Sequence, residues 1–192
     1  MNNIDYHKPT RAQWWDYRNA GAYFVTINTD NMKSYFGTVT ENQMFLSASG
    51  SIAKFKWIGI PRHVKHVELG NFVVMPNHIH GILYIMDDAV DVSEDDSARH
   101  VGLDDSARHA LQLQILGKTP GQLRLQKPGK NSLSTIIGSY KSAVTKECRE
   151  RSLEFSWQPR FHDRIIRDEK EFSMLEKYID TNIERWNARY NQ

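Results

Sequence analysis

The sequence has very little cysteine and no long apolar run, and both shortages narrow the kinds of protein it can be. Cys148 is the single cysteine among 192 residues, which excludes a disulfide framework and a cysteine-rich zinc site. No run of 18 apolar residues occurs, and the segment from Met1 to Arg11 is polar, without the apolar stretch of a signal peptide. We therefore expect a cytoplasmic protein without a membrane-spanning helix.

The composition is that of a globular protein with an uneven distribution of charge. Hydrophobic residues make up 40% and charged residues 25% of the chain, which excludes disordered, collagen-like and coiled-coil proteins. Residues 87–110 hold eight acids and two bases, whereas the rest of the chain holds 23 bases and 15 acids. A basic body with one acidic segment is compatible with a polyanionic ligand such as nucleic acid.

The acidic segment belongs to a longer stretch, residues 87–130, that differs from its surroundings. The hexapeptide DDSARH at residues 95–100 recurs nine positions later as residues 104–109. Gly and Pro residues interrupt the remainder of the stretch. Two copies are too few for a solenoid, so we predict a flexible surface insertion within one domain that spans 1–192. Its His100 and His109 are poor ligand candidates.

Strand signals dominate before this insertion. Residues 22–28 alternate around aromatic and β-branched side chains, and 36–40 with 44–47 predict a hairpin. Ser49 or Ser51 is suited to cap a helix over about 52–58, which Gly59 ends. Two apolar runs follow, about 67–75 and 79–86, and the Pro76-Asn77 turn between them predicts antiparallel neighbours.

Helical spacing dominates after the insertion. A helix is predicted from the cap candidates Asn131 and Ser132 to about Arg151, then a short strand over 161–167. Asp168 should cap one last helix, whose apolar stripe is Phe172, Leu175, Ile179, Ile183, Trp186 and Tyr190. Apart from the hairpin, the order of strand, helix, two strands, helix, strand and helix predicts an α+β fold. It is a ferredoxin-like split βαβ sandwich with an antiparallel sheet and an additional C-terminal helix.

The sharpest local feature is the pair His78 and His80 near the start of a predicted strand. Side chains two positions apart on a strand point to the same face, so both imidazoles are able to hold one divalent metal ion. The alternative is a pair of hydrogen-bonded histidines beside a turn. On the last helix, Tyr178 and Asn182 are four residues apart and would share a side, with Tyr178 flanking the apolar stripe.

Three stretches together carry a resemblance to a known family. The segment PNHIHGIL, the stretch WQPRFHDRIIRDEKEF (residues 157–172) and the final Tyr178-Ile-x-x-Asn182 resemble the HUH single-tyrosine transposases, which are insertion-sequence-200-like. GAYFVTINT (residues 21–29) also resembles their REP-associated branch. Relatives in that branch usually carry proline at the position of Ile183, and the acidic duplication is a further departure.

The resemblance implies a transposase that cuts and rejoins single-stranded, hairpin-bearing DNA in transposition through a 5′-phosphotyrosine intermediate. It implies that Tyr178 is the nucleophile and that His78, His80 and Asn182 hold a divalent metal, Mg²⁺ or Mn²⁺. Such chemistry is sound, because a metal polarises a phosphoryl oxygen and a positioned phenol then attacks the phosphorus. Relatives act as homodimers with exchanged helices or as monomers, and the sequence leaves both states open.

Basic and aromatic side chains near the predicted last strand are candidates for DNA contacts. Trp157, Arg160 and Arg164, together with Lys141 on the preceding helix, combine phosphate-binding charges with a stacking ring. The alternative for each is an ordinary surface or core residue. His162 stays unassigned.

The sequence also allows other roles for some residues and other functions for the protein. Tyr140 is a second candidate nucleophile, although its place in the apolar stripe of its helix favours a buried core residue. Cys148 lies in the same stripe and is predicted to be a small buried hydrophobic residue. His63 and His66 are more simply solvated histidines. A domesticated or inactive protein that only binds hairpin DNA is the main functional alternative, and a metal hydrolase that ignores DNA is a third.

Overall fold

The computed structural model describes residues 20–86 and 132–190, and it confirms the α+β class. A four-stranded antiparallel sheet has the order β4-β5-β1-β6, which is the strand order of a ferredoxin-like fold. Its strands are β1 (Gly21–Asn28), β4 (Val67–Met75), β5 (His78–Ile85) and β6 (His162–Ile166). The helices are α1 (Ala48–Ile58), α2 (Ile60–His63), α5 (Leu133–Glu150), α6 (Glu169–Asp180) and α7 (Asn182–Tyr190). The predicted insertion 87–130 lies outside the described residues.

The central strand β1 shows why the sheet has two different faces. Tyr23, Val25 and Ile27 are fully buried in the larger hydrophobic core. The alternate residues of β1 point to the other face, where Phe24, Thr26 and Asn28 are half-buried and Ala22 is buried in a second, smaller core. The predicted period of two is therefore confirmed.

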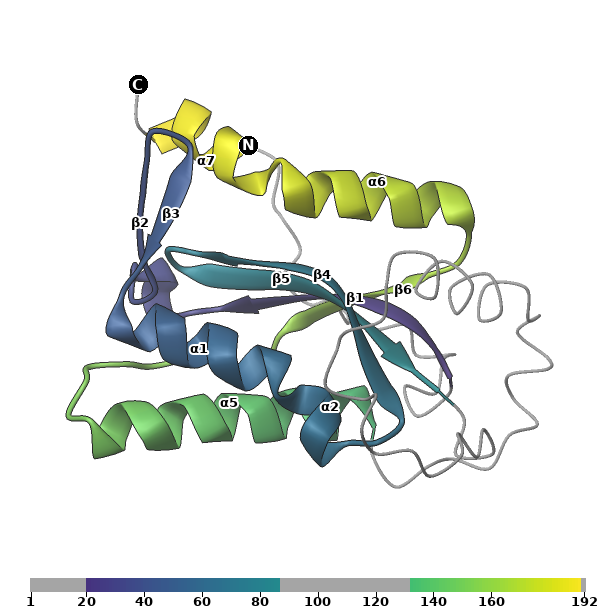
Figure 1. Cartoon of the computed structure of the whole chain (residues 1–192), viewed down its shortest axis with the longest axis horizontal. Coiled ribbons are helices and arrows are strands. Elements are labelled where there is room, and N and C mark those ends of the chain that lie inside the picture. Colours follow the sequence, from purple (N-terminus) through teal and green to yellow (C-terminus); the bar gives the residue numbers. More distant parts are fainter. Residues whose placement is uncertain (1–19, 87–131, 191–192) are drawn as a thin grey trace, which may run out of the picture.

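The larger core fills the space between the sheet and helices α1 and α5, which lie side by side below the sheet in Figure 1. Trp57 of α1 is fully buried there and packs edge-on against Tyr140 of α5. A Cβ atom on Gly81 of β5 would lie 2.4 Å from the Trp57 ring, so only glycine allows this approach. Tyr140 itself is buried and donates a hydrogen bond to the Ala53 carbonyl at 3.1 Å. The prediction that Tyr140 and Cys148 are core residues is confirmed.

The opposite face of the sheet is covered by α6 and α7 (Figure 1). Phe172, Leu175 and Ile179 of α6 pack on Ile82 and other residues of the sheet in a smaller core. This smaller core covers the end of the face that is far from the start of β5. The histidine end of β5 is consequently left to α7 and the end of α6.

Two helix caps match the predictions and one does not. The side chains of Ser132 and Asp168 accept hydrogen bonds from the backbone N–H groups of Thr135 and Glu171. The first helix begins at Ala48 rather than near 52, because Ser47, not Ser49 or Ser51, accepts the hydrogen bond from the Gly50 N–H. The prediction of its start was wrong by one turn.

The hairpin lies beside the main sheet as a separate two-stranded unit. It joins β2 (Gly37–Thr40) to β3 (Gln43–Leu46) through Glu41 and Asn42, whose φ angles are 52° and 57°. Two positive φ values are the mark of a tight hairpin turn. A short 3₁₀ helix, η1 (Asp30–Met32), follows β1.

The single last helix that the sequence predicted is two helices. α6 ends at Asp180 and α7 begins at Asn182, and between them Thr181 has φ −91° and ψ 6°. A ψ value near zero takes the chain out of the α-helical region, and the Thr181 hydroxyl donates to the Lys177 carbonyl at 2.7 Å. The prediction of one helix with a continuous apolar stripe from Phe172 to Tyr190 was therefore wrong. The helix breaks without a proline at position 183.

Within residues 20–86 and 132–190 there is no helix with the length and apolar character needed to cross a bilayer.

Candidate active site

The two histidines of β5 lie together at the start of the strand. The ring centroids of His78 and His80 are 4.5 Å apart, on the sheet face that α6 and α7 cover. Ile79 between them points into the larger core with no exposed area. The prediction that both imidazoles share one face is confirmed.

Each imidazole is oriented by an oxygen next to its Nδ1 atom. His78 Nδ1 donates to Asn77 Oδ1 at 2.7 Å, and the Asn77 amide is itself held because its Nδ2 donates to the Met32 carbonyl at 3.0 Å. His80 Nδ1 lies 2.8 Å from the hydroxyl oxygen of Thr26, its direct partner on β1. Because the Asn77 oxygen can only accept, His78 carries its proton on Nδ1, the tautomer whose Nε2 has the lone pair for a metal ion; the Thr26 hydroxyl suits either tautomer of His80.

Tyr178 of α6 reaches this histidine pair within the same chain. Its hydroxyl lies 3.4 Å from His80 Nε2, at the long end of the hydrogen-bond range, and the two ring centroids are 5.1 Å apart. Phe24 of β1 stacks on His80 and meets Tyr178 edge-on. The half-buried phenol is thereby confined beside the imidazole.

Helix α7 closes the other side of the pair. Asn182, only 6% exposed, is hydrogen-bonded to His78, whose ring also lies 5.9 Å from that of Trp186. Arg185 places its guanidinium carbon 5.2 Å from the centroid of the Tyr178 ring. The break at Thr181 thus lets Tyr178 meet His80 while Asn182 meets His78.

Burial keeps both imidazoles neutral. Desolvation lowers the pKa of His78 to about 4, although its hydrogen bond to Asn182 raises it in part. Desolvation, and then the charge of a protonated His78, lowers the pKa of His80 to about 3. Neutral imidazole is the form that binds metal ions, so both rings are competent ligands at neutral pH.

The donor set fits a divalent cation of modest softness. Two oriented imidazoles and the amide oxygen of Asn182 supply nitrogen and oxygen ligands that such ions accept. Among the described residues, no three His, Cys, Asp or Glu side chains gather into a metal-binding cluster, so the fit depends on the amide. Three protein ligands leave coordination positions for water or substrate oxygens.

The four residues predicted to contact DNA have different surroundings in the structure. Lys141 donates to the carbonyls of Gln158 at 2.7 Å and Arg160 at 2.9 Å, and Trp157 Nε1 donates to the Lys141 carbonyl. The Trp157 ring packs on Phe36 and Phe155, and Arg164 forms an ion pair with Glu171. Arg160 is exposed at the rim of a pocket. Of the four, Lys141 and Trp157 are engaged in holding a loop.

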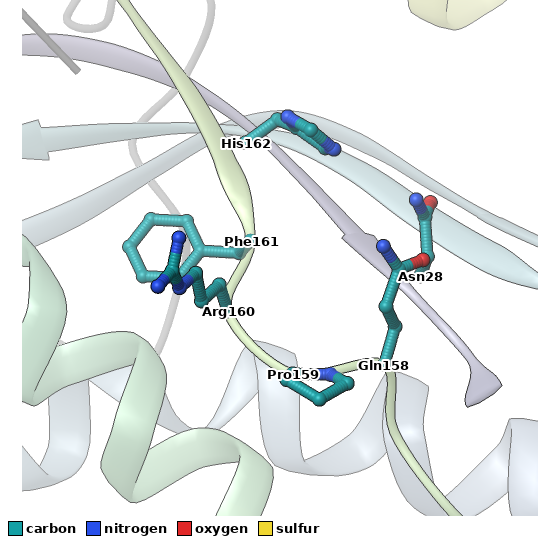
Figure 2. A pocket seen from close by; sticks show the side chains of 6 residues that line it. All are labelled: Asn28, Gln158, Pro159, Arg160, Phe161 and His162. Atoms are coloured by element: carbon teal, nitrogen blue, oxygen red, sulfur yellow. The ribbon is translucent and has the colours of Figure 1, made fainter. Parts of the chain in front are cut away.

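That pocket lies at the edge of the sheet, next to the site. It has a volume of about 140 Å³ and is lined by Asn28, Gln158, Pro159, Arg160, Phe161 and His162 (Figure 2). A second hollow of about 330 Å³ runs along α5 between Lys141, Lys146 and Arg149. Of the two histidines predicted to be solvated, His63 is exposed at the end of α2, whereas His66 is half-buried with its Nε2 atom buried, so the prediction was wrong for His66.

Sequence reasoning missed Thr26, Asn77, Arg185 and Trp186. Asn77 directly precedes His78, so its adjacency was a usable signal. Thr26 is separated from His80 by 54 residues, and only the strand register brings the two together. The α7 residues depend on the helix break, for which the sequence holds no proline or glycine signal.

Comparison with known proteins finds a relative of similar length. No protein-family model matches it. A protein of Haemophilus influenzae, described as uncharacterized, is 31% identical over 190 residues, which cover 95% of this chain and 91% of that protein. The chain belongs to the family of this Haemophilus protein. The match extends over nearly the whole length of both members.

The fold also resembles a solved structure of a REP-associated tyrosine transposase bound to a REP hairpin. The TM-score is 0.55, the alignment covers 91% of this chain and 72% of that chain, and 19% of residues are identical. At this level of identity the likeness establishes the shared fold.

Proposed function

We propose that this protein is an HUH-type, single-tyrosine DNA endonuclease and strand transferase. It would cut and rejoin single-stranded DNA next to a hairpin, as a transposase does. The observation that carries the proposal is the 3.4 Å approach of the Tyr178 hydroxyl to Nε2 of His80, one of two imidazoles that oxygen partners orient. The shared fold with a transposase bound to hairpin DNA supports it.

Tyr178 is the proposed nucleophile. Its phenolic oxygen would form a bond to the phosphorus as the bond from phosphorus to the 3′ oxygen breaks, giving a 5′-phosphotyrosine and a free 3′-hydroxyl. The phenol loses a proton and the 3′ oxygen gains one, so no ATP is consumed. Because one phosphodiester bond replaces another, the reverse attack by a 3′-hydroxyl rejoins DNA.

His78, His80 and Asn182 would hold a divalent cation, Mg²⁺ or Mn²⁺. Such an ion polarises a phosphoryl oxygen and helps to fix the scissile phosphate beside a nucleophile. The ring centroids of the two neutral imidazoles are 4.5 Å apart, and Arg185 is placed to pair with a phosphate next to Tyr178. The Tyr178 phenol and both imidazoles meet within one chain.

The test uses hairpin DNA with single-stranded flanks, labelled at either its 5′ or its 3′ end. With Mn²⁺, the wild type should form a covalent adduct that survives denaturing electrophoresis and carries the 3′ label, while the 5′-labelled fragment is released. Tyr178→Phe should form no adduct, and Tyr190→Phe, an exposed tyrosine of α7, should behave as the wild type.

The outcomes separate the proposal from its alternative. Equal adduct from wild type and Tyr178→Phe removes Tyr178 from the role. An adduct that carries the 5′ label overturns the proposed polarity. Salt-sensitive DNA binding with no adduct in any divalent metal would assign the protein as a hairpin-DNA-binding protein that no longer cuts.

A further inference from the structure

We propose that Asn28, Gln158 and His162 form a recognition pocket for one unpaired base of the DNA, with adenine preferred. This inference depends on the proposed function, because the base belongs to the strand whose phosphate lies at the histidine pair. It assigns a role to the 140 Å³ pocket at the sheet edge.

The strand register places this pocket beside the histidines and on their face of the sheet. In the antiparallel pairing, Thr26 is opposite His80 on one side and opposite His162 on the other. Directly paired residues of neighbouring strands point to the same face. His162 is therefore two strand spacings, about 10 Å, from His80.

Asn28 extends the same surface by one further row. It is the direct partner of His78 and lies two positions after Thr26, so both side chains are on the same face of β1. Figure 2 shows the amides of Asn28 and Gln158 ending next to each other, with the His162 ring beside them. A DNA strand with a phosphate at the histidine pair is able to place a neighbouring base over these three groups.

The chemistry of the pocket favours a base over a phosphate. Each amide offers a donor and an acceptor, and an imidazole offers one of each, whereas a phosphate needs donors alone. Among the described residues, no side chain or backbone group is hydrogen-bonded to the side chains of Asn28, Gln158 or His162. Asparagine and glutamine amides pair in two-point fashion with adenine, which makes adenine the expected base.

The size of the pocket agrees with this ligand. Its volume of about 140 Å³ is several times the ~30 Å³ that one water molecule occupies, which suits a ring-sized group. Arg160 is exposed and also lines the pocket, with its side chain beside the Phe161 ring (Figure 2).

The loop that carries Gln158 is held in place before any ligand binds. The Gln158 N–H donates to the Asn28 carbonyl at 3.0 Å, and Lys141 bonds the carbonyls of Gln158 and Arg160. Arg160 adopts a φ of 66°, an uncommon conformation for a residue with a side chain. Such backbone strain is typical of binding sites, where it keeps the recognition groups preorganised.

The experiment selects DNA by binding in EDTA, so that recognition is measured apart from cleavage. Hairpins with randomised single-stranded flanks are bound to the full-length wild type, recovered and sequenced. We expect adenine to be enriched about tenfold at one unpaired position, the scale of one two-point base contact. Asn28→Ala and Gln158→Ala should each lose this enrichment and keep the preferences at other positions. Gln43→Ala, an exposed amide on the separate hairpin, should keep it.

A second variant guards against a folding artefact. Gln158→Glu leaves the backbone contacts of the loop and turns the amide into an acceptor, so the enriched base should change from adenine toward cytosine, which presents an amino donor. Replacing the selected adenine by an abasic residue should weaken binding about tenfold for the wild type and not for Asn28→Ala.

Each failure points to a different conclusion. Binding with no position-specific base preference, or with a preference that the Asn28 and Gln158 variants retain, overturns the recognition pocket alone. An adduct assay that fails while the adenine preference persists overturns the proposed cleavage and keeps the pocket. Absence of DNA binding overturns both.

Discussion

The hydroxyl oxygen of Thr26 lies 2.8 Å from Nδ1 of His80, on the side of the imidazole away from the Tyr178 hydroxyl. The His80 ring therefore contacts the Thr26 side chain of β1 at Nδ1 and the Tyr178 phenol of α6 at Nε2. The orientation of the candidate ligand atom depends on this contact, since an imidazole rotates or changes tautomer without a partner.

Thr26→Val should weaken metal binding while keeping the shape of the site. Outer partners of metal-binding histidines typically contribute 10- to 100-fold in affinity, so we expect the Mn²⁺ affinity to fall about that much. The orphaned Nδ1 should also lower the free energy of unfolding by about 1–3 kcal/mol. Calorimetric titration and urea unfolding measure the two effects. Thr26→Ser keeps the hydroxyl and should resemble the wild type; equal affinity in the valine variant would contradict the orienting role.

Acid should destabilise the metal-free protein. The folded-state pKa values of His78 and His80 are about 4 and about 3, below the ordinary histidine value of 6.5. The unfolded chain therefore binds more protons, and the free energy of unfolding should decrease as pH falls from about 6.5 to 4, by a few kcal/mol in total. Urea unfolding in EDTA at a series of pH values measures it.

The matched variants for this experiment are two histidine substitutions. His80→Asn should flatten the pH dependence, because it removes one of the two buried titrating groups. His63→Asn changes an exposed residue and should leave the slope as it is. A slope that is unchanged in His80→Asn would show that another group controls the acid response.

Lys141→Met should loosen the loop that carries the edge pocket. The ammonium group bonds the Gln158 and Arg160 carbonyls, and burial lowers the pKa of Lys141. Charge-assisted bonds that are partly exposed are expected to contribute about 1–2 kcal/mol. Hydrogen exchange of the 157–162 amides should accelerate. Lys146→Met removes an exposed charge of the same helix and should not accelerate it; protection retained in Lys141→Met would refute the clamp.

Arg185→Gln should slow adduct formation by about two- to fivefold. A cation over an aromatic ring at an exposed site contributes about 0.5–1 kcal/mol, and loss of this contact frees the Tyr178 ring. The chain offers a matched control in Arg189→Gln, which removes the same charge from the Tyr190 ring. The measurement is the rate of covalent adduct formation at saturating DNA. Equal slowing in both variants would indicate a loss of general charge attraction instead.

Local patterns predicted the framework because each depends on neighbours in the chain. The alternation in β1 reflects a period of two that any strand must follow, and Ser132 and Asp168 cap helices through contacts three residues away. The shared face of His78 and His80 follows from the same period. Such features needed no knowledge of the rest of the molecule.

Side chains with more than one suitable partner were less predictable. Lys141 and Trp157 have the charge and the ring that DNA contacts require, but both are hydrogen-bonded within the protein. Arg164 pairs with Glu171, a residue of the next helix. Sequence spacing does not supply the distances to these internal partners, and the contacts of the three residues with DNA stay a prediction.

The sequence by itself determined the strands, most helix limits and the pairing of two imidazoles on one face, since hydrophobic period and capping act over a few residues. Only the tertiary structure decided that Thr26 supports His80, that Thr181 divides the last helix, and that Tyr178 and Asn182 face different histidines. These relationships join segments from separate elements, and the burial of the two sheet faces brings those elements together.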